Sequence, residues 1–247
     1  RQRLQIGAEL IGSDSVAAAT EVVLTAIEAL DAVGLGPLSV DFTLPDLVTT
    51  LAKSTFPLSP DQAEKVRREL DTKDAGGLKA IGGEAFLPLI HAAGPFPDAL
   101  EKLRAVDAGG ALATRIEGLE QIAAAIGDRA RITLDPTERH GFEYQSWFGF
   151  TLYAANVRGA LGRGGTYLIR GTDEPATGFS IYLGQALPLL DTDAPRDMLY
   201  LPLAHDRDAA ARLRAEGWRT LRALSEDEDP RALGCTHRLE DGAPTAL

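Results

Sequence analysis

Cysteine is scarce in this sequence and long apolar runs are missing, and both absences narrow the possible functions. Cys235 is the only cysteine in 247 residues. This excludes an internal disulfide framework and a metal site built from several cysteines, and it is consistent with a reducing compartment. No apolar run approaches the roughly 18 residues needed to span a bilayer, and no basic segment followed by an apolar one begins the sequence. We therefore expect a cytoplasmic protein without a membrane partner.

Positive charge is also in short supply. The sequence has 25 lysines and arginines against 36 aspartates and glutamates, which gives a formal net charge of -11. Because binding to a duplex or to tRNA depends on neutralising phosphates with lysine and arginine, we expect no nucleic-acid partner. His91, His205 and His237 lack metal-ligand spacing, and no Ser-His-Asp or Cys-His arrangement is recognisable. The sequence thus predicts no metal site, no cofactor and no catalytic residue.

Apolar residues, in contrast, make up 45% of the sequence, enough for one sizeable core and a small satellite domain. Residues 4–11 alternate apolar and polar side chains, which is the pattern of a half-buried strand. Because side chains alternate between the two faces of a strand, Gln5, Gly7 and Glu9 should share one face.

A helix and a second strand should complete a strand-helix-strand unit at the start of the chain. Ser13 or Asp14 can cap the helix, which should run to Leu30 and end before Gly34. The second strand is expected over residues 39–44.

The rest of the chain changes texture several times. We expect short helices over 45–127, a pair of antiparallel strands within 131–160, a tight glycine-rich turn at 161–165, a strand over 166–170, a helix over 177–190, and a strand, helix, strand and irregular tail over 198–247. The chain therefore divides into a core in two parts, a helical insertion and a small α/β remnant. Their bounds are 1–44 and 128–192 for the core, 45–127 for the insertion and 193–247 for the remnant.

Four short motifs occur in an order typical of one known family. They are Gln5-Ile-Gly-Ala-Glu9 with Leu10-Ile-Gly12, Arg139-His-Gly-Phe-Glu-Tyr144, Gly162-Arg-Gly-Gly-Thr-Tyr167 and Ala176-Thr-Gly-Phe-Ser-Ile-Tyr-Leu183. In this order they resemble the catalytic core of histidyl-tRNA synthetase, a class II aminoacyl-tRNA synthetase, and the resemblance covers about residues 1–190. It implies an α+β fold with an antiparallel active-site sheet, flanking helices and a helical insertion.

Two departures from the synthetase pattern remove residues that carry its chemistry. In that family an arginine of the second motif stabilises the activated carboxylate and phosphate, and aligning on Gly141 puts His140 at this position. Another arginine ends the fourth motif and grips the γ-phosphate of ATP, where this sequence has Gln185. Adenylate formation builds negative charge that fixed cations stabilise, and neither a glutamine nor a mostly neutral histidine supplies one. Arg139, expected on a strand, should point to the opposite face.

The residues that would hold an amino acid are retained. In the synthetases the positions matching Gln5 and Glu9 bind the α-ammonium of histidine, and the aromatic residue matching Tyr144 lies beside the imidazole. Glycines in the third motif permit close approach of the backbone to a ligand. The expected histidine-binding residues are Gln5, Glu9, His140, Tyr144, Gly164 and Gly165.

A synthetase core without its chemistry and without a full anticodon-binding domain resembles the regulatory subunit of ATP phosphoribosyltransferase. This resemblance implies a non-catalytic subunit that activates the short-form catalytic subunit in the first step of histidine biosynthesis. It also implies feedback inhibition by histidine and self-association within a hetero-oligomer. Two alternatives stay open: an active histidyl-tRNA synthetase or other amino-acid-activating class II ligase, and a sensor domain cut from a larger signalling protein. Because Arg1 is not an initiator methionine, we expect residues upstream of it.

Overall fold

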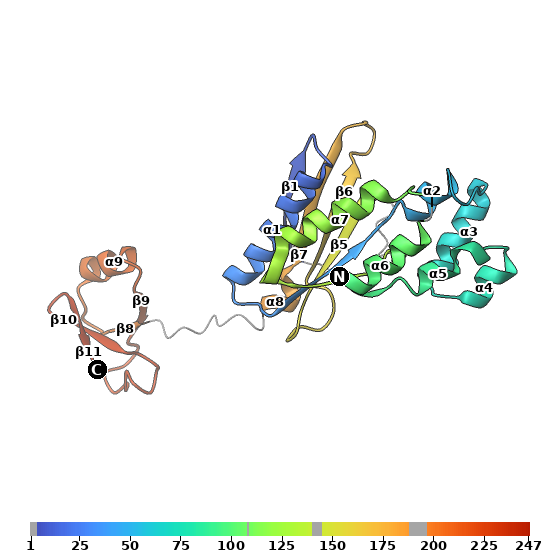
Figure 1. Cartoon of the computed structure of the whole chain (residues 1–247). Helices are drawn as coiled ribbons and strands as arrows, with labels where there is room; N and C mark the ends of the chain where they lie inside the picture. Colours follow the sequence, from blue (N-terminus) through green and yellow to red (C-terminus); the bar gives the residue numbers. More distant parts are fainter. Residues whose placement is uncertain (1–3, 108, 140–144, 188–196) are drawn as a thin grey trace. The chain divides into compact units, whose positions relative to one another are not determined.

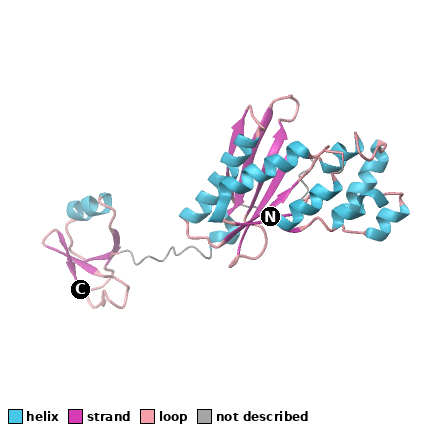
Figure 2. Ribbon diagram, viewed as in Figure 1, coloured by secondary structure: helices cyan, strands magenta, loops and turns pink. Residues whose placement is uncertain are grey.

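The chain forms two compact units, Arg1–Leu190 and Asp191–Leu247. The computed structural model describes residues 4–107, 109–139, 145–187 and 197–247, and the two units are drawn in Figures 1 and 2. None of the described helices has the length and apolar character that crossing a membrane requires.

A seven-stranded sheet forms the centre of the first unit, with the strand order β1-β7-β6-β5-β2-β4-β3. Its strands are β1 (Gln5–Ile11), β2 (Leu38–Thr43), β3 (Gly94–Pro95), β4 (Arg131–Leu134), β5 (Gln145–Ala154), β6 (Gly162–Leu168) and β7 (Pro175–Tyr182). Neighbouring strands are antiparallel except β2 and β4, which are parallel. The expected α+β class with an antiparallel sheet is therefore confirmed.

Helices cover one face of this sheet and gather beside it. The helices are α1 (Val16–Ala32), α2 (Leu47–Ala52), α3 (Pro60–Asp71), α4 (Ala75–Ala80), α5 (Leu87–Ile90), α6 (Phe96–Val106), α7 (Ala113–Ile126) and α8 (Leu183–Ala186), with short 3-10 turns at Glu84–Phe86 and Gly127–Arg129. Helices α1 and α7 contact each other and run across the sheet, whereas α2 to α5 cluster at one side (Figure 1). Helices α1 and α7 therefore cover one face of the central strands, and the opposite face carries side chains of the strands themselves.

Helix α1 shows how local sequence sets an element that covers the sheet. Its N-cap residue is Ser15, whose side chain accepts a hydrogen bond from the backbone N–H of Ala18. The sequence predicted Ser13 or Asp14 instead, but the Ser13 hydroxyl donates to the Ser15 hydroxyl. The apolar positions recur every three or four residues and are buried: Ala18, Ala19, Val22, Val23, Ala26, Ile27 and Leu30.

The two faces of the sheet differ because side chains alternate along each strand. Val40 and Phe42 of β2 are completely buried in the core that also contains α1 and α7. Asp41 lies between them and therefore points to the opposite face, which also carries Gln5 and Glu9 of β1. We call this side of the sheet the polar face.

Two segments of the sheet contradict the expectations from sequence. The turn expected at residues 161–165 is wrong, because Gly162–Leu168 form strand β6, paired with both β5 and β7. The helix expected over residues 177–190 is also wrong, because Pro175–Tyr182 form strand β7. Four successive residues of β7 are buried, and such an apolar run is compatible with a fully buried strand as well as with a helix.

The expected pairing within residues 131–160 is likewise wrong. The strands β4 and β5 exist, but each pairs with β2, which lies between them. Leu152 of β5 lies opposite Val40 of β2, and both are completely buried. Strand β2, which is distant in sequence, therefore lies between β4 and β5 and separates them. The two strands of the first strand-helix-strand unit are not neighbours either, since three strands separate β1 from β2 in the sheet.

The second unit is a four-stranded sheet with one helix. Its elements are β8 (Met198–Leu201), α9 (Arg207–Ala215), β9 (Arg219–Arg222), β10 (His237–Glu240) and β11 (Ala243–Ala246), and its strand order is β11-β10-β8-β9. Asp206 caps α9 by accepting hydrogen bonds from the backbone of Asp208 and Ala209. The expected irregular tail is wrong, because β10 and β11 form there and Leu239 is buried against the helix side of the sheet.

Candidate functional site

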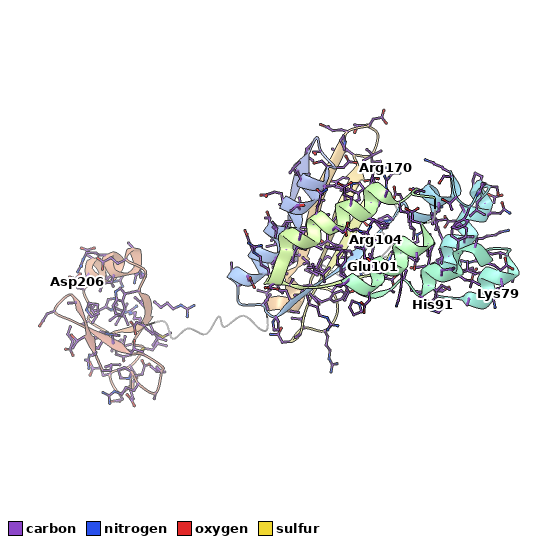
Figure 3. All side chains as sticks on the ribbon, in the orientation of Figure 1. Lys79, His91, Glu101, Arg104, Arg170 and Asp206 are labelled. Carbon is purple, nitrogen blue, oxygen red and sulfur yellow. The ribbon has the colours of Figure 1, made fainter. Side chains whose placement is uncertain are left out.

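A cleft of about 690 Å³ opens on the polar face of the first unit, a size typical of small-molecule pockets. Strands β1, β5, β6 and β7 and the segment that follows β6 supply its described lining. The side chains that can bind a ligand include Gln5, Glu9, Gln145, Arg163, Tyr167 and Arg170. Arg170 extends from the segment between β6 and β7 (Figure 3).

Glycines form the floor of this cleft. Glu9 lies opposite Gly178, which lies opposite Gly165, which in turn lies opposite Gly149, so that one row of the sheet carries three glycines in succession. A Cβ atom at Gly178 would clash with the Glu9 carboxylate. The carboxylate therefore lies over Gly178, and the floor offers backbone alone while functional side chains stand around it.

Two hydrogen bonds fix the orientation of three of the side chains that line the cleft. The Tyr167 hydroxyl donates to Oε2 of Glu9, and Nε2 of Gln145 donates to the carbonyl oxygen of Gly164 over 2.9 Å. An ionised carboxylate has room for further donors, because its two oxygens can accept about four hydrogen bonds. Glu9 is therefore suited to take a cation above the glycine floor.

The structure brings together four of the six residues expected from sequence. Gln5, Glu9, Gly164 and Gly165 all line the cleft. His140 and Tyr144 lie outside the described residues, as does the side chain of Gln185. Gly164 and Gly165 contribute from inside a strand and not from a turn.

Sequence reasoning missed Arg163, Tyr167 and Arg170 as lining residues. The signal for two of them was present, because Arg163 and Tyr167 are two residues on either side of Gly165 and must share its face once residues 162–168 form a strand. Arg139, by contrast, does not line the cleft. Its backbone N–H donates to Asp71 and its guanidinium pairs with Glu64 at 3.1 Å, so it faces α3.

A second group of charged side chains lies further along the polar face, where the chain leaves β4. Asp41 and Glu138 are hydrogen-bonded to each other, and Asp135 and Lys73 add charges of opposite sign beside them. Burial, together with the neighbouring carboxylates of Asp41 and Asp135, raises the pKa of Glu138 to about 7. Burial also raises the pKa of Asp41. No three histidine, cysteine or acidic residues among those described are arranged to hold a metal ion.

The shared proton predicts a pH-dependent stability. The folded protein holds the Glu138 proton up to about pH 7, whereas the unfolded chain releases it near the ordinary pKa of about 4.3. Between these values the folded state binds more protons, so the free energy of unfolding falls as the pH rises. Glu138→Gln should remove this loss and gain roughly 1 kcal/mol over the wild type at pH 8, after allowing for solvent screening of a half-buried group.

Urea denaturation at pH 5, 6.5 and 8 measures this gain, which should shrink toward pH 5. Glu28→Gln, a change of the same kind at an exposed position of α1, should show no such trend. A gain at Glu138 that stays constant across the range would contradict the assignment of the proton.

A family model described as histidyl-tRNA synthetase matches residues 1–186, three quarters of the chain. Several curated relatives carry the name ATP phosphoribosyltransferase regulatory subunit. The chain belongs to the histidyl-tRNA synthetase family, in the branch of ATP phosphoribosyltransferase regulatory subunits.

The regulatory subunit of Rhodospirillum centenum is 38% identical over 96% of this chain. The match spans 64% of that relative, and the first relatives found are all matched over about two thirds of their length or slightly less. The chain thus represents only part of the length of these regulatory subunits.

Solved structures give the same fold. A structure from Bacillus halodurans, described as an ATP phosphoribosyltransferase regulatory subunit/histidyl-tRNA synthetase, superposes with a TM-score of 0.73 at 21% identity and covers 93% of this chain and 65% of its own. The ATP phosphoribosyl transferase (HisG:HisZ) complex from Thermotoga maritima gives a TM-score of 0.60 at 21% identity over 73% of this chain and 66% of its own. The synthetase-like fold of this regulatory-subunit branch is therefore established.

Proposed function

We propose that the protein to which this chain belongs activates a short-form ATP phosphoribosyltransferase catalytic subunit and mediates feedback inhibition by histidine. The observation that carries the proposal is the cleft, in which Gln5 and Glu9 present acceptors above a glycine floor. The two positions that hold catalytic arginines in the synthetases carry His140 and Gln185. The site thus has groups for binding an amino acid and lacks those for activating it.

Its relatives support the choice of partner. The curated relatives are named as regulatory subunits of this enzyme, and the Thermotoga maritima neighbour was solved as a complex of two kinds of subunit. We infer that this protein partners a catalytic subunit in the same way and associates with itself within the assembly. The net charge of -11 opposes the runner-up function, a working tRNA ligase, because a tRNA-binding surface needs many cations.

The partnership predicts a higher activity than the catalytic subunit shows alone. The full-length protein and its cognate short-form catalytic subunit, mixed at micromolar concentrations, should co-elute in size-exclusion chromatography. Their mixture should turn over ATP and phosphoribosyl pyrophosphate at least about tenfold faster than the catalytic subunit alone, since a rate change of that size needs only about 1.4 kcal/mol of transition-state stabilisation.

The same preparation separates the two functions through pyrophosphate exchange with ATP and histidine. No exchange is expected, because each missing transition-state cation costs about a hundredfold in rate or more. Exchange at the rate of a synthetase, or a catalytic subunit that is fully active alone and elutes unchanged after mixing, would overturn the proposal.

A further inference from the structure

Arg163 has a position on the cleft that the sequence motifs did not assign. It is two residues before Gly165 on β6 and lies opposite Ser180 of β7 and Thr151 of β5. Gly7 occupies the same row on β1, next to Ser180. The neighbours paired directly with Arg163 on the polar face are therefore small, and Tyr153 of β5 lies close enough to interact with its charge.

The distance from Arg163 to Glu9 suits a single small zwitterion. The Glu9 carboxylate lies over Gly178. Arg163 is on the adjacent strand and two residues further along, which places the two backbone positions about 8 Å apart, given strands about 4.8 Å apart and a rise of about 3.3 Å per residue. An α-amino acid separates its nitrogen from its carboxylate carbon by about 2.5 Å, and hydrogen bonds of about 2.8 Å at both ends require the Glu9 carboxylate and the Arg163 guanidinium to be about 8 Å apart. The long, rotatable side chain of Arg163 can place its guanidinium at that distance.

A ligand ammonium held by Glu9 brings a carboxylate that needs donors. A guanidinium carries five N–H donors in a fork that matches a carboxylate, so it can bind one while keeping other contacts. Arg170 also lines the cleft, but it follows the end of β6 and its side chain is exposed. Arg163 is half-buried on a central strand and so has the more defined position.

We propose that Arg163 binds the α-carboxylate of the amino acid whose α-ammonium lies at Glu9, so that the cleft selects ligands carrying both charges. This inference rests on the proposed function, since it takes histidine as the effector. It assigns a new role to this chain, because an arginine on β6 then takes the carboxylate where the second motif carries His140.

Pairs of ligands with and without a carboxylate test the proposal on the full-length protein. Calorimetry would compare L-histidine with histidinol, which keeps the ammonium and the imidazole but has a hydroxymethyl group instead of the carboxylate. We expect the wild type to bind histidine at least about tenfold more tightly, because hydrogen bonds to charged groups contribute more than neutral ones. In Arg163→Gln the two ligands should bind within about threefold of each other, through weaker binding of histidine alone.

Two further variants complete the design. Arg163→Lys keeps one cation and should retain part of the preference for histidine, and Arg170→Gln removes a cation from the same cleft and should retain all of it. Arg163→Gln that binds histidine and still prefers it as strongly as the wild type would overturn the role of Arg163 and leave the proposed function standing. A wild type that binds neither ligand would overturn both.

Discussion

Glu9→Ala should weaken histidine binding at least about thirtyfold, since hydrogen bonds between two charged groups are stronger than neutral ones and their loss costs about 2 kcal/mol or more. The Tyr167 hydroxyl orients the Glu9 carboxylate over the glycine floor. No other acidic side chain among the described residues lines the cleft and could replace it. Isothermal titration calorimetry measures the affinity. Histidine inhibition curves of the assembled enzyme should shift by a similar factor, because an effector can shift the equilibrium of the enzyme only through its own binding.

Two other variants separate this role from a general loss of structure. Glu21→Ala removes the same charge from an exposed position of α1 and should leave histidine binding unchanged. Gly178→Ala keeps Glu9 but places a methyl group where its carboxylate lies, so it should weaken binding as well. Activation of the catalytic subunit should persist in Glu9→Ala. Wild-type affinity in both Glu9→Ala and Gly178→Ala would mean that histidine binds elsewhere, at the interface with the catalytic subunit.

Gly165→Ala should destabilise the first unit by about 3 kcal/mol, the sum of local backbone strain and overpacking. Its φ of 155° lies where side chains are strained. An added Cβ would clash with the backbone oxygen of Phe148 and lie 3.0 Å from Cα of Gly149, both on the neighbouring strand. Because β6 is held between β5 and β7, it cannot move aside without breaking a ladder.

Urea denaturation followed by far-ultraviolet circular dichroism would measure this loss. Gly184→Ala is the matched control, since an added Cβ at this position has no atom within 4 Å. The substitution also replaces a glycine within a helix. It should be neutral or slightly stabilising, by up to about 1 kcal/mol. Equal stability of Gly165→Ala and the wild type would show that the floor yields to a side chain and is not set by strand packing.

Local pattern predicted the elements whose evidence lies within one short segment. The alternation over residues 4–11 predicted β1 and the shared face of Gln5 and Glu9, but the expected half-burial is wrong, because almost all of the strand is exposed. The spacing of apolar residues gave α1, with an error of one or two residues at its cap. Both elements depend on residues that are close together in the sequence, so the local pattern was sufficient to predict them.

Features that depend on distant neighbours were not predictable in the same way. Glycine weakens an isolated strand, so residues 162–165 favoured a turn. In the fold, an added Cβ at Gly162, Gly164 or Gly165 would clash with β5 or β7. The insertion of β2 between β4 and β5 is a non-local pairing that sequence order does not reveal. Arg163 and Tyr167 became recognisable as cleft residues only when β6 was known to be a strand, and the family resemblance assigned neither of them.

The position of β1 at the edge of the sheet links the affinity for a ligand to the local stability of this edge. Within the described residues β1 is an edge strand whose backbone pairs with β7 alone, and its side chains are mostly exposed. Edge segments with few buried contacts open locally at low free-energy cost. An effector that binds Glu9 on β1 and groups on β6 reaches across β7, which lies between these strands. It therefore links the edge strand to the interior of the sheet. Effector binding and resistance of this edge to local opening are therefore two expressions of one free energy, and any partner that grips or loosens β1 would tune the response to histidine without touching the cleft.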